Sequence, residues 1–527
     1  MTTRLLVRGR IYTPTSPTAT AMAVEDGVVT WIGEDRTGRA LHPGAEVIDL
    51  SGAFVAPAFV DTHVHLSATG LRLTGPHLAT PTRAAALAEL RGHATAGVVL
   101  ARGWDPDVWP DGPLTVTDLD AACGDRAVYA ARVDEHSAQA STALRAAVPD
   151  LVALDGYHPE LALTGPAHDA VRVAAQDALT DAQITAAHRA ALDAAAATGI
   201  VAVHECSGPE IAGERDFALL RGLQHGVQVR RYWGEAARDA AHATELMTRT
   251  GAHGLAGDLF VDGSLGSHTA LLSAPYADAD TVGTAVLDQA AVTTHVLACT
   301  EARIQAGFHA IGDAAVGRVV TALAAAVDAF GGPRVAACGH RIEHAEMVTA
   351  RQAERLGAWA VHASMQPAFD ALWGGGSGMY ARRLGPDRAA GLNDFALLAR
   401  NAVPLAFSSD SPVTPLDPWA TIRAATTHHT AGSAVSPRAA FTASTRGAWR
   451  AGGVRDGIAG TLVPGAPASY AVWDVDELVV KAPADAVARW STDPRAGVAP
   501  LPDLSPGARL PRCLRTVSAG VTIFEAA

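Results

Sequence analysis

Histidines and acidic residues stand at the ends of several apolar, strand-like runs, where they could hold a metal ion. His63 and His65 are two residues apart, so on an extended strand both side chains point to one face. His309 and His344 lie on two later runs, and Asp410 ends a third. Neutral imidazoles with one or two carboxylates are the ligands that a hydrolytic Zn²⁺, or a similar divalent ion, requires. The order of these residues predicts one metal centre assembled from distant parts of the chain.

Each of these residues also has an ordinary structural role open to it. Two histidines at this spacing occur without a metal. His309 could be a core histidine, His344 could belong to a surface run of charges, and Asp410 could cap a helix. It is the combination, in this order along the chain, that favours the metal centre.

Alternating strands and helices must position these side chains. From about residue 56 to residue 454, apolar runs alternate with alanine-rich helical stretches, which is typical of a parallel α/β architecture. Thr180 and Gln183 form a capping-box pattern that predicts a helix ending before Gly199. The length suits a (β/α)₈ barrel of the TIM type, in which the carboxyl ends of all strands meet at one mouth.

Nine runs are candidate strands of this barrel: Ala53–His65, Val98–Trp104, Ala127–Asp134, Ile200–Glu205, Asp258–Asp262, Phe308–Ile311, Arg341–His344, Val361–Gln366 and Pro404–Asp410. A barrel needs eight. We therefore expect the second or the third run to belong to an insertion around residues 70–165. Residues 1–55 and 455–527 read instead as short strands and turns.

Composition excludes several classes of protein. Of 527 residues, 49% are hydrophobic, and 41 basic residues stand against 54 acidic ones, so nucleic-acid binding is disfavoured. No apolar run is long enough for a membrane span, and the first residues lack a signal-peptide core. Five scattered cysteines without a CxxC pair indicate a reducing compartment, and we expect a cytoplasmic protein.

Motifs across nearly the whole chain resemble the amidohydrolase superfamily, and specifically its amidohydrolase-3 (YtcJ-like) branch, which includes N-substituted formamide deformylases. The motifs are Phe59-Val-Asp-Thr-His-Val-His65, Arg102-Gly-Trp-Asp105 with Trp109-Pro110, Asp134-Glu-His-Ser137, Val203-His-Glu205, the run Phe260–Ala270, His309-Ala-Ile-Gly-Asp313, Arg341-Ile-Glu-His344, Ser364-Met-Gln-Pro367, Ser408-Ser-Asp410 and the closing run Gly460–Tyr470.

This resemblance implies a (β/α)₈ metal-dependent hydrolase barrel over residues 56–454 and a small β-sandwich domain formed by residues 1–55 and 455–527. It also implies hydrolysis of a carbon–nitrogen bond in a small amide-like molecule, such as an N-substituted formamide. A homodimer is compatible with it. No nucleic-acid or membrane partner is expected.

The chain departs from the family pattern at two places. Many relatives have, where Asp258 stands, a lysine that can be carboxylated to bridge two metals. The single lysine, Lys481, lies near the C-terminus, so no carboxylated lysine is expected. Glu205 is the predicted replacement ligand, with Asp258 as the second choice. Relatives often have a histidine after Gln-Pro, whereas Ala368 and Phe369 follow Pro367 here.

The predicted centre thus holds one or two ions, most simply Zn²⁺, through His63, His65, Glu205, His309, His344 and Asp410. Asp410 is the predicted catalytic base, which takes a proton from the attacking water. Trp104, Asp105 and His136 are the predicted substrate-binding residues, because they lie in insertion-prone segments. Two alternatives stay open: a hydrolytic deaminase of a small heterocycle, and a non-catalytic barrel used for binding.

Overall fold

The computed structural model describes residues 3–93, 97–106, 109–132, 137–480 and 499–527. Contacts divide the chain into two compact units. One unit comprises Met1–His65 together with Leu192–Ala527, and the other comprises Leu66–Ala191. The insertion that we expect around residues 70–165 lies within the second unit. Among the described residues, no helix is long and apolar enough to cross a membrane.

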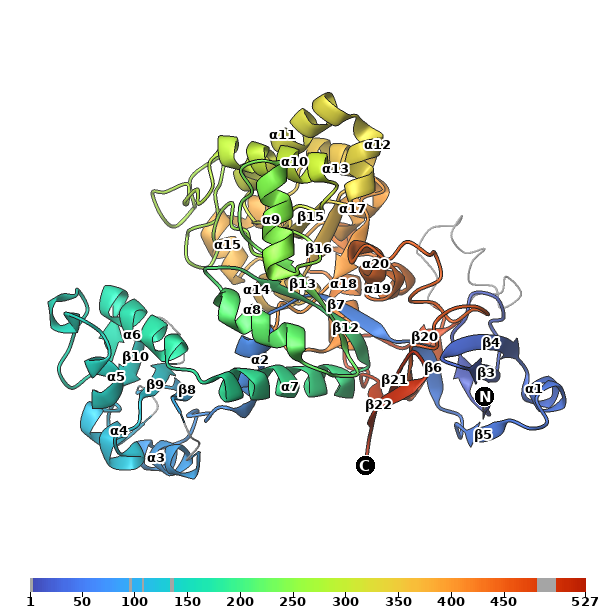
Figure 1. Ribbon diagram of the computed structural model, residues 1–527, viewed down its shortest axis with the longest axis horizontal. Coiled ribbons are helices and arrows are strands. Elements are labelled where there is room, and N and C mark those ends of the chain that lie inside the picture. Colours follow the sequence, from blue (N-terminus) through green and yellow to red (C-terminus); the bar gives the residue numbers. More distant parts are fainter. Residues whose placement is uncertain (1–2, 94–96, 107–108, 133–136, 481–498) are drawn as a thin grey trace. The chain divides into compact units, whose positions relative to one another are not determined.

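Parallel strands form the centre of the first unit (Figure 1). They pair in two groups, β7-β12-β13 and β14-β15-β16-β17. Their bounds are β7 (Phe59–Val64), β12 (Ile200–Ser207), β13 (Gln228–Trp233), β14 (Gly307–Ala310), β15 (Arg341–His344), β16 (His362–Met365) and β17 (Leu405–Phe407). β7 and β12 are buried along their whole length, as expected for strands covered on both faces.

Isolated parallel bridges join the two groups. Tyr232 of β13 bridges to Gly254, and the adjacent Leu255 bridges to Ala306, next to β14. Val64 of β7 bridges to Ser411, which follows β17. The parallel pairing therefore runs from β7 through β13, the segment around 254–260 and β17, and returns to β7. This is a TIM-barrel-type α/β arrangement.

The strand prediction was wrong in one respect. Both Val98–Trp104 and Ala127–Asp134 fall in the second unit, where they correspond to β8 (Val99–Trp104) and β9 (Val128–Arg132). The strand that takes their place in the ring is β13, which we did not predict. Its sequence carries Arg230 and Arg231 in the middle of the strand, so it shows no continuous apolar run.

Helices separate the strands of the ring and follow the last one. They are α8 (Gly213–Gly222), α9 (Ala240–Thr250), α10 (Gln289–Ala302), α11 (Asp313–Phe330), α12 (Gly332–Cys338), α13 (Ala350–Ala358), α14 (Pro367–Trp373), α15 (Met379–Leu384), α16 (Pro386–Ala389), α17 (Phe395–Arg400), α18 (Pro418–Thr426), α19 (Pro437–Ala443) and α20 (Arg446–Ala451). The predicted capping box is present at α7 (Asp181–Ala197): the Gln183 amide donates to Thr180 Oγ1 and the Thr180 amide donates to Gln183 Oε1.

The second unit has its own sheet, in the order β11-β10-β9-β8. Besides β8 and β9 it contains β10 (Ser137–Ala140), β11 (Leu163–Thr164), α2 (Leu66–Thr74), α3 (Arg83–Gly92), α4 (Val116–Cys123), α5 (Thr142–Ala146) and α6 (Gly165–Asp177). Leu78, Leu90, Leu119 and Val128 belong to its apolar core, together with Trp104.

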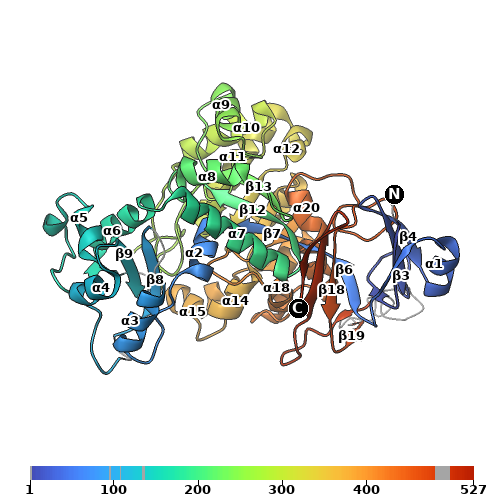
Figure 2. The same cartoon turned by 60° about the horizontal axis from the view of Figure 1, so that its bottom comes forward.

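Strands from both ends of the chain form two further sheets, β4-β3-β1-β5 and β2-β6-β18-β21-β22. They are built from β1 (Arg4–Val7), β2 (Arg10–Ile11), β3 (Ala21–Glu25), β4 (Val28–Gly33), β5 (Glu46–Asp49), β6 (Phe54–Pro57), β18 (Tyr470–Asp474), β21 (Arg512–Ser518) and β22 (Val521–Glu525), and α1 (Asp35–Leu41) lies between β4 and β5. Figure 2 shows β6 beside β18, with which it pairs in antiparallel register. Leu6, Met22, Val55, Tyr470 and Val517 share one buried cluster, so both sheets contribute to a common core.

Candidate metal centre

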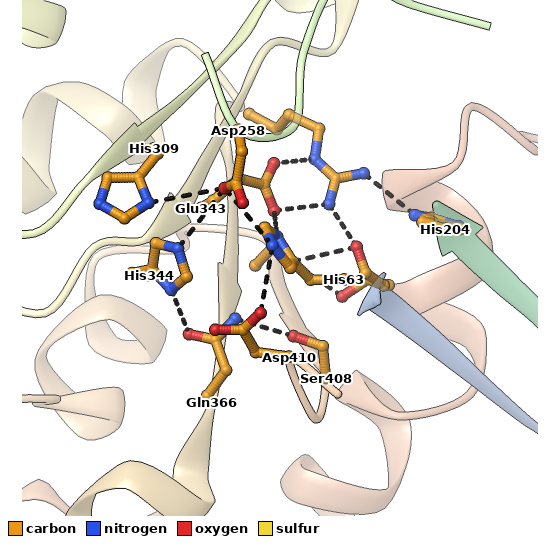
Figure 3. A network of polar contacts seen from close by, with 12 residues as sticks. His63, His204, Asp258, His309, Glu343, His344, Gln366, Ser408 and Asp410 are labelled. Atoms are coloured by element: carbon orange, nitrogen blue, oxygen red, sulfur yellow. Dashed lines mark hydrogen bonds and ion pairs between the residues drawn. The ribbon is translucent and has the colours of Figure 1, made fainter. Parts of the chain in front are cut away.

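Six side chains from different strand ends of the first unit converge on one place (Figure 3 labels five of them). His63 lies in β7 and His65 directly follows it, His309 lies in β14, and His344 ends β15. Asp410 follows β17, and Asp258 lies in the segment that bridges β13 and β14. We call these six residues the metal-centre residues. They come together because parallel strands of one ring present their carboxyl ends on the same side.

Asp258 is the hub of this group. Its Oδ1 lies 3.5 Å from His63 Nε2, 3.5 Å from His309 Nδ1 and 3.8 Å from His344 Nε2. Its Oδ2 lies 3.2 Å from His65 Nε2. Asp410 Oδ1 lies 3.2 Å from His65 Nε2 and 3.5 Å from His63 Nε2. One carboxylate therefore faces four imidazoles, and a second faces two of them.

The atoms that face one another are left without hydrogen bonds. Over the part of the chain that the structure describes, five of them are buried and have no hydrogen-bond partner: His63 Nε2, His309 Nδ1, His344 Nε2, Asp258 Oδ1 and Asp410 Oδ1. Burying polar atoms unpaired is costly, so their convergence needs a compensating partner. Ligand atoms about 2.0–2.2 Å from one tetrahedral ion lie roughly 3.3–3.6 Å apart, close to the distances found here. The residues present fit a divalent cation.

The pKa shifts within this group also favour a bound cation. Burial alone would raise the pKa of Asp258, but His63, His309 and His344 outweigh it and hold that pKa well below its usual range. Burial would lower the pKa of His65, yet the carboxylates of Asp258 and Asp410 raise it to about 10. In the absence of a metal the pair of carboxylates thus attracts protons onto the imidazoles. A divalent cation satisfies the same demand for positive charge.

Glu205, the predicted ligand, is not part of this group. It lies in β12 between His204 and Cys206, and neighbouring residues of a strand point to opposite faces. Cys206 faces His63 and Glu343, and His204 faces Arg341, so Glu205 points away from them. The second choice, Asp258, is the carboxylate that the structure places among the imidazoles. The direction of its side chain was not predictable, because Asp258 lies outside a regular strand.

A buried ion pair between Arg341 and Glu343 orients the His63 ring. Glu343 Oε2 lies 3.0 Å from His63 Nδ1 and accepts a hydrogen bond from it, which leaves Nε2 without a proton on the metal-centre side. Arg341 donates to both oxygens of Glu343 and, at 2.6 Å, to the backbone oxygen of Thr62. Glu343, Arg341 and His63 are all fully buried. Because Arg341 compensates for burial, the pKa of Glu343 is lowered to about 2.

Two more side chains orient the other ligands. Gln366 Oε1 lies 2.9 Å from His344 Nδ1, and the Gln366 amide donates at 3.0 Å to Ser408 Oγ, so His344 donates from Nδ1 and keeps Nε2 bare. Asp61 accepts from the backbone N–H groups of His63 and Ser409, which ties β7 to the segment before Asp410. Burial raises the pKa of Asp61 to about 6. We call Asp61, Arg341, Glu343, Gln366 and Ser408 the support residues.

Backbone conformation at two ligands is unusual. His344 has φ 69° and Asp410 has φ 54°, both in the left-handed region that side-chain-bearing residues rarely adopt. Each residue stands where a strand ends and the chain turns over the site. Strain of this kind persists where the surrounding structure enforces it, and it is concentrated at functional sites.

Cys206 lies close to His63 and Glu343. Burial raises the pKa of its thiol to about 12, so it stays protonated at neutral pH. Glu343 is already engaged by Arg341. This second cluster therefore has the character of a packed support for His63 and not of a further ligand set.

The predicted substrate-binding residues lie in the second unit. Trp104 is 1% exposed, donates its indole N–H to Ala130 at 2.9 Å and stacks on Trp109 with a centroid distance of 5.7 Å. Asp105 is half-buried beside it. His136 lies outside the described residues, as does Lys481. A role of these residues in substrate binding stays a prediction.

Comparison with known proteins fixes the family. Residues 46–524 match the model of the Amidohydrolase family. The chain belongs to this family. Among curated proteins, this amidohydrolase is 27% identical to the putative amidohydrolase YtcJ of Bacillus subtilis, over 77% of the chain and 79% of that protein. It is also 27% identical to Protein LONG AFTER FAR-RED 3 of Arabidopsis thaliana, over 80% of the chain and 77% of that protein.

Solved structures agree in fold. An uncharacterized metal-dependent hydrolase from Pyrococcus furiosus superposes with a TM-score of 0.75 at 28% identity, covering 90% of this amidohydrolase and 99% of that chain. A second uncharacterized metal-dependent hydrolase, from Pyrococcus horikoshii, gives a TM-score of 0.74 at 25% identity, covering 90% and 98%. The superfamily branch expected from the motifs is thereby supported.

Proposed function

We propose that this amidohydrolase is a metal-dependent enzyme that hydrolyses a carbon–nitrogen bond of a small amide-like substrate, with N-substituted formamides as the first class to test. One observation carries the proposal: five buried donor atoms from five separate strand or segment ends face one another without hydrogen bonds. Evolutionary likeness to metal-dependent hydrolases supports it.

The ligand set contains three overlapping groups of side chains. They are His63, His65 and Asp258; Asp258, His309 and His344; and His63, His344 and Asp410. Asp258 belongs to two of them: its Oδ1 faces His63, His309 and His344, and its Oδ2 faces His65. Imidazole nitrogens and carboxylate oxygens are ligands that Zn²⁺ accepts, and overlapping groups of this kind would suit one or two ions.

A divalent ion held by these residues would supply a Lewis acid, which would make a water more acidic and a substrate carbonyl more electrophilic. Asp410 then acts as the general base: its carboxylate takes the proton from the water and delivers it to the departing amine nitrogen. Its Oδ1 faces His63 and His65 and its backbone is held in a strained turn, so the carboxylate is fixed in place. Glu343 and Gln366 keep the two imidazoles that they contact in the tautomer that leaves Nε2 free.

Phe369 shapes the space next to His344. Its ring lies parallel to that imidazole with a centroid distance of 6.2 Å and packs on Trp373. Here the chain departs from relatives that carry a histidine nearby. An apolar wall beside the metal centre favours a substrate with an apolar substituent, such as the N-alkyl or N-aryl group of a substituted formamide.

Two measurements test the proposal together. Elemental analysis of the purified protein should give one or two equivalents of a divalent transition metal per chain. A panel of formamides, other small amides and amino-substituted heterocycles should release amine from the amides in a chelator-sensitive manner. Ammonia released only from the heterocycles would replace this proposal with a deaminase, and metal-free protein without hydrolysis would remove the enzymatic assignment.

A further inference from the structure

A second polar cavity lies at the other end of the strand ring from the metal centre. It has a volume of about 290 Å³. Ala360 and Pro404, which line it, precede β16 and β17, and His362 begins β16. The metal-centre residues His344 and Asp410 stand at or after the carboxyl ends of β15 and β17. Since the strands are parallel, the cavity opens at their amino ends and is separate from the metal centre.

Three arginines, all exposed to solvent, line this cavity, and none of its lining residues in the described part of the chain is acidic. Arg446 and Arg450 are four residues apart on α20, so they project from one face of that helix, and Arg455 follows in the next loop. In the described part of the chain, these three guanidinium groups have neither a hydrogen bond nor an ion pair. The nearest acidic neighbour in sequence, Asp456, accepts from the backbone N–H groups of Ile458 and Ala459.

This concentration of charge is unusual for the molecule. The whole chain carries a net charge of −13, so unpaired arginines have many acidic residues to choose from. Some arginines elsewhere are paired in this way: Arg509 pairs with Asp474 and Asp476, and Arg383 pairs with Asp278. Three arginines kept together without a counter-charge create a strongly positive hollow.

A buried histidine completes the lining. His362 is 8% exposed, and its Nδ1 is buried without a hydrogen-bond partner among the described residues. Burial and the charges of Arg341, Arg450 and Arg455 lower its pKa to about 3, so it is neutral and has one unsatisfied ring nitrogen. The cavity therefore combines three solvent-exposed guanidinium groups with one buried, unpaired ring nitrogen, a lining that suits an anionic ligand able to accept several hydrogen bonds.

We propose that this cavity binds a phosphate group, either as inorganic phosphate or as the headgroup of a small phosphorylated molecule. Guanidinium groups donate in forked pairs that match the oxygens of a phosphate. A phosphate with two charges and several acceptor oxygens can engage three arginines, whereas a single carboxylate offsets only one of them. The volume holds a phosphate with a small organic substituent. The site is therefore a non-catalytic binding site, additional to the proposed hydrolase centre.

Equilibrium dialysis of labelled inorganic phosphate against the metal-loaded protein tests this directly. The wild type should bind phosphate, and the double variant Arg450→Gln/Arg455→Gln should bind it at least about tenfold more weakly at that site. Any phosphate held by the metal centre would remain in this variant, so the two sites are distinguished. The matched control is Arg36→Gln/Arg39→Gln, which removes the same charge from two exposed arginines of α1 and should bind like the wild type.

Glycerol 3-phosphate and succinate serve as competing probes. Displacement by glycerol 3-phosphate but not by succinate supports a phosphate site open to phosphorylated molecules. Competition by succinate alone would overturn the proposal in favour of a carboxylate site. Equal binding of phosphate by the wild type and by folded Arg450→Gln/Arg455→Gln, judged by an unchanged melting temperature, would also overturn it.

Discussion

The metal-centre residues and the support residues beneath them are both buried and polar, yet they differ in one respect. Each support residue is fully engaged: Arg341 holds Glu343, Glu343 holds His63, and Gln366 links His344 to Ser408. Among the described residues, five of the six metal-centre residues direct a nitrogen or oxygen without a hydrogen bond at one another: His63, Asp258, His309, His344 and Asp410. A folded protein pairs nearly all its buried polar groups. The contrast therefore separates groups that hold the structure from groups reserved for a ligand.

Removing the Asp258 carboxylate should have the largest effect on the metal centre. Asp258→Asn takes away the carboxylate that faces all four imidazoles, so metal content should fall by at least half and hydrolysis should fall to background. Metal analysis and amide turnover on the same preparation measure both. Glu205→Gln, which changes a buried carboxylate on the opposite face of β12, is the control and should keep its metal. If Glu205→Gln lost the metal and Asp258→Asn kept it, our ligand assignment would be reversed.

Next in size is the loss of the proposed base. Asp410→Asn preserves shape and removes the proton acceptor, so kcat should fall by about 10²–10⁴-fold while the protein stays folded. Circular dichroism, metal content and turnover separate these effects. Substantial residual turnover by metal-loaded Asp410→Asn would show that another group takes the proton.

Weakening one support residue should have a graded effect. Gln366→Leu removes the acceptor for His344 Nδ1, so metal affinity should fall by about 10–100-fold. Ser408→Ala removes only the partner of the Gln366 amide and should cost less. Competition against a metal-binding dye measures both. Equal affinities for Gln366→Leu and the wild type would mean that the orientation of His344 does not depend on this bond.

Protons should compete with the metal ion for the His65 imidazole. His65 in the metal-free protein is protonated below a pKa of about 10, and a metal binds only the neutral ring. Metal uptake near neutral pH should therefore release a proton, and apparent affinity should fall by up to about tenfold for each unit by which the pH is lowered. Calorimetric titrations in two buffers of different ionisation enthalpy give the number of protons. A pH-independent affinity would contradict the charged state inferred for His65.

The smallest expected effect lies in the second unit. Trp104→Phe removes the indole donor to Ala130 and should lower the free energy of unfolding by about 1 kcal/mol. If Trp104 only packs within its unit, KM for the amide substrate stays the same. A clear rise in KM without a loss of stability would support the substrate contact that we predicted from the sequence.

Much of the metal centre was predictable because strand geometry is regular. The HxH spacing fixed the common face of His63 and His65, and the strand-end positions of His309, His344 and Asp410 placed them at one rim. The choice between Glu205 and Asp258 was not predictable. It depends on which face of β12 points inward. It also depends on the path of the irregular segment around Asp258, which is joined to its neighbours by bridges at Gly254 and Phe260.

The fold shows the same limit. The alternation of strands and helices indicated the α/β class, and the capping box located the start of α7. β13 was not predicted because Arg230 and Arg231 interrupt its apolar pattern. β8 and β9 resemble barrel strands because the local sequence of a strand does not specify which sheet the strand joins. Near the C-terminus, where we expected short strands and turns, β21 and β22 form a hairpin that turns at Ala519 and Gly520.

The pairing of β6 with β18 has a consequence for the order of assembly. β6 directly precedes the strand that carries His63, but its antiparallel partner is synthesised more than 400 residues later. Val64, in the same strand as His63, likewise cannot form its bridge until Ser411 has been synthesised. The edges of these early strands therefore stay unpaired during translation until their partner residues have been synthesised, and unpaired strand edges are prone to premature association.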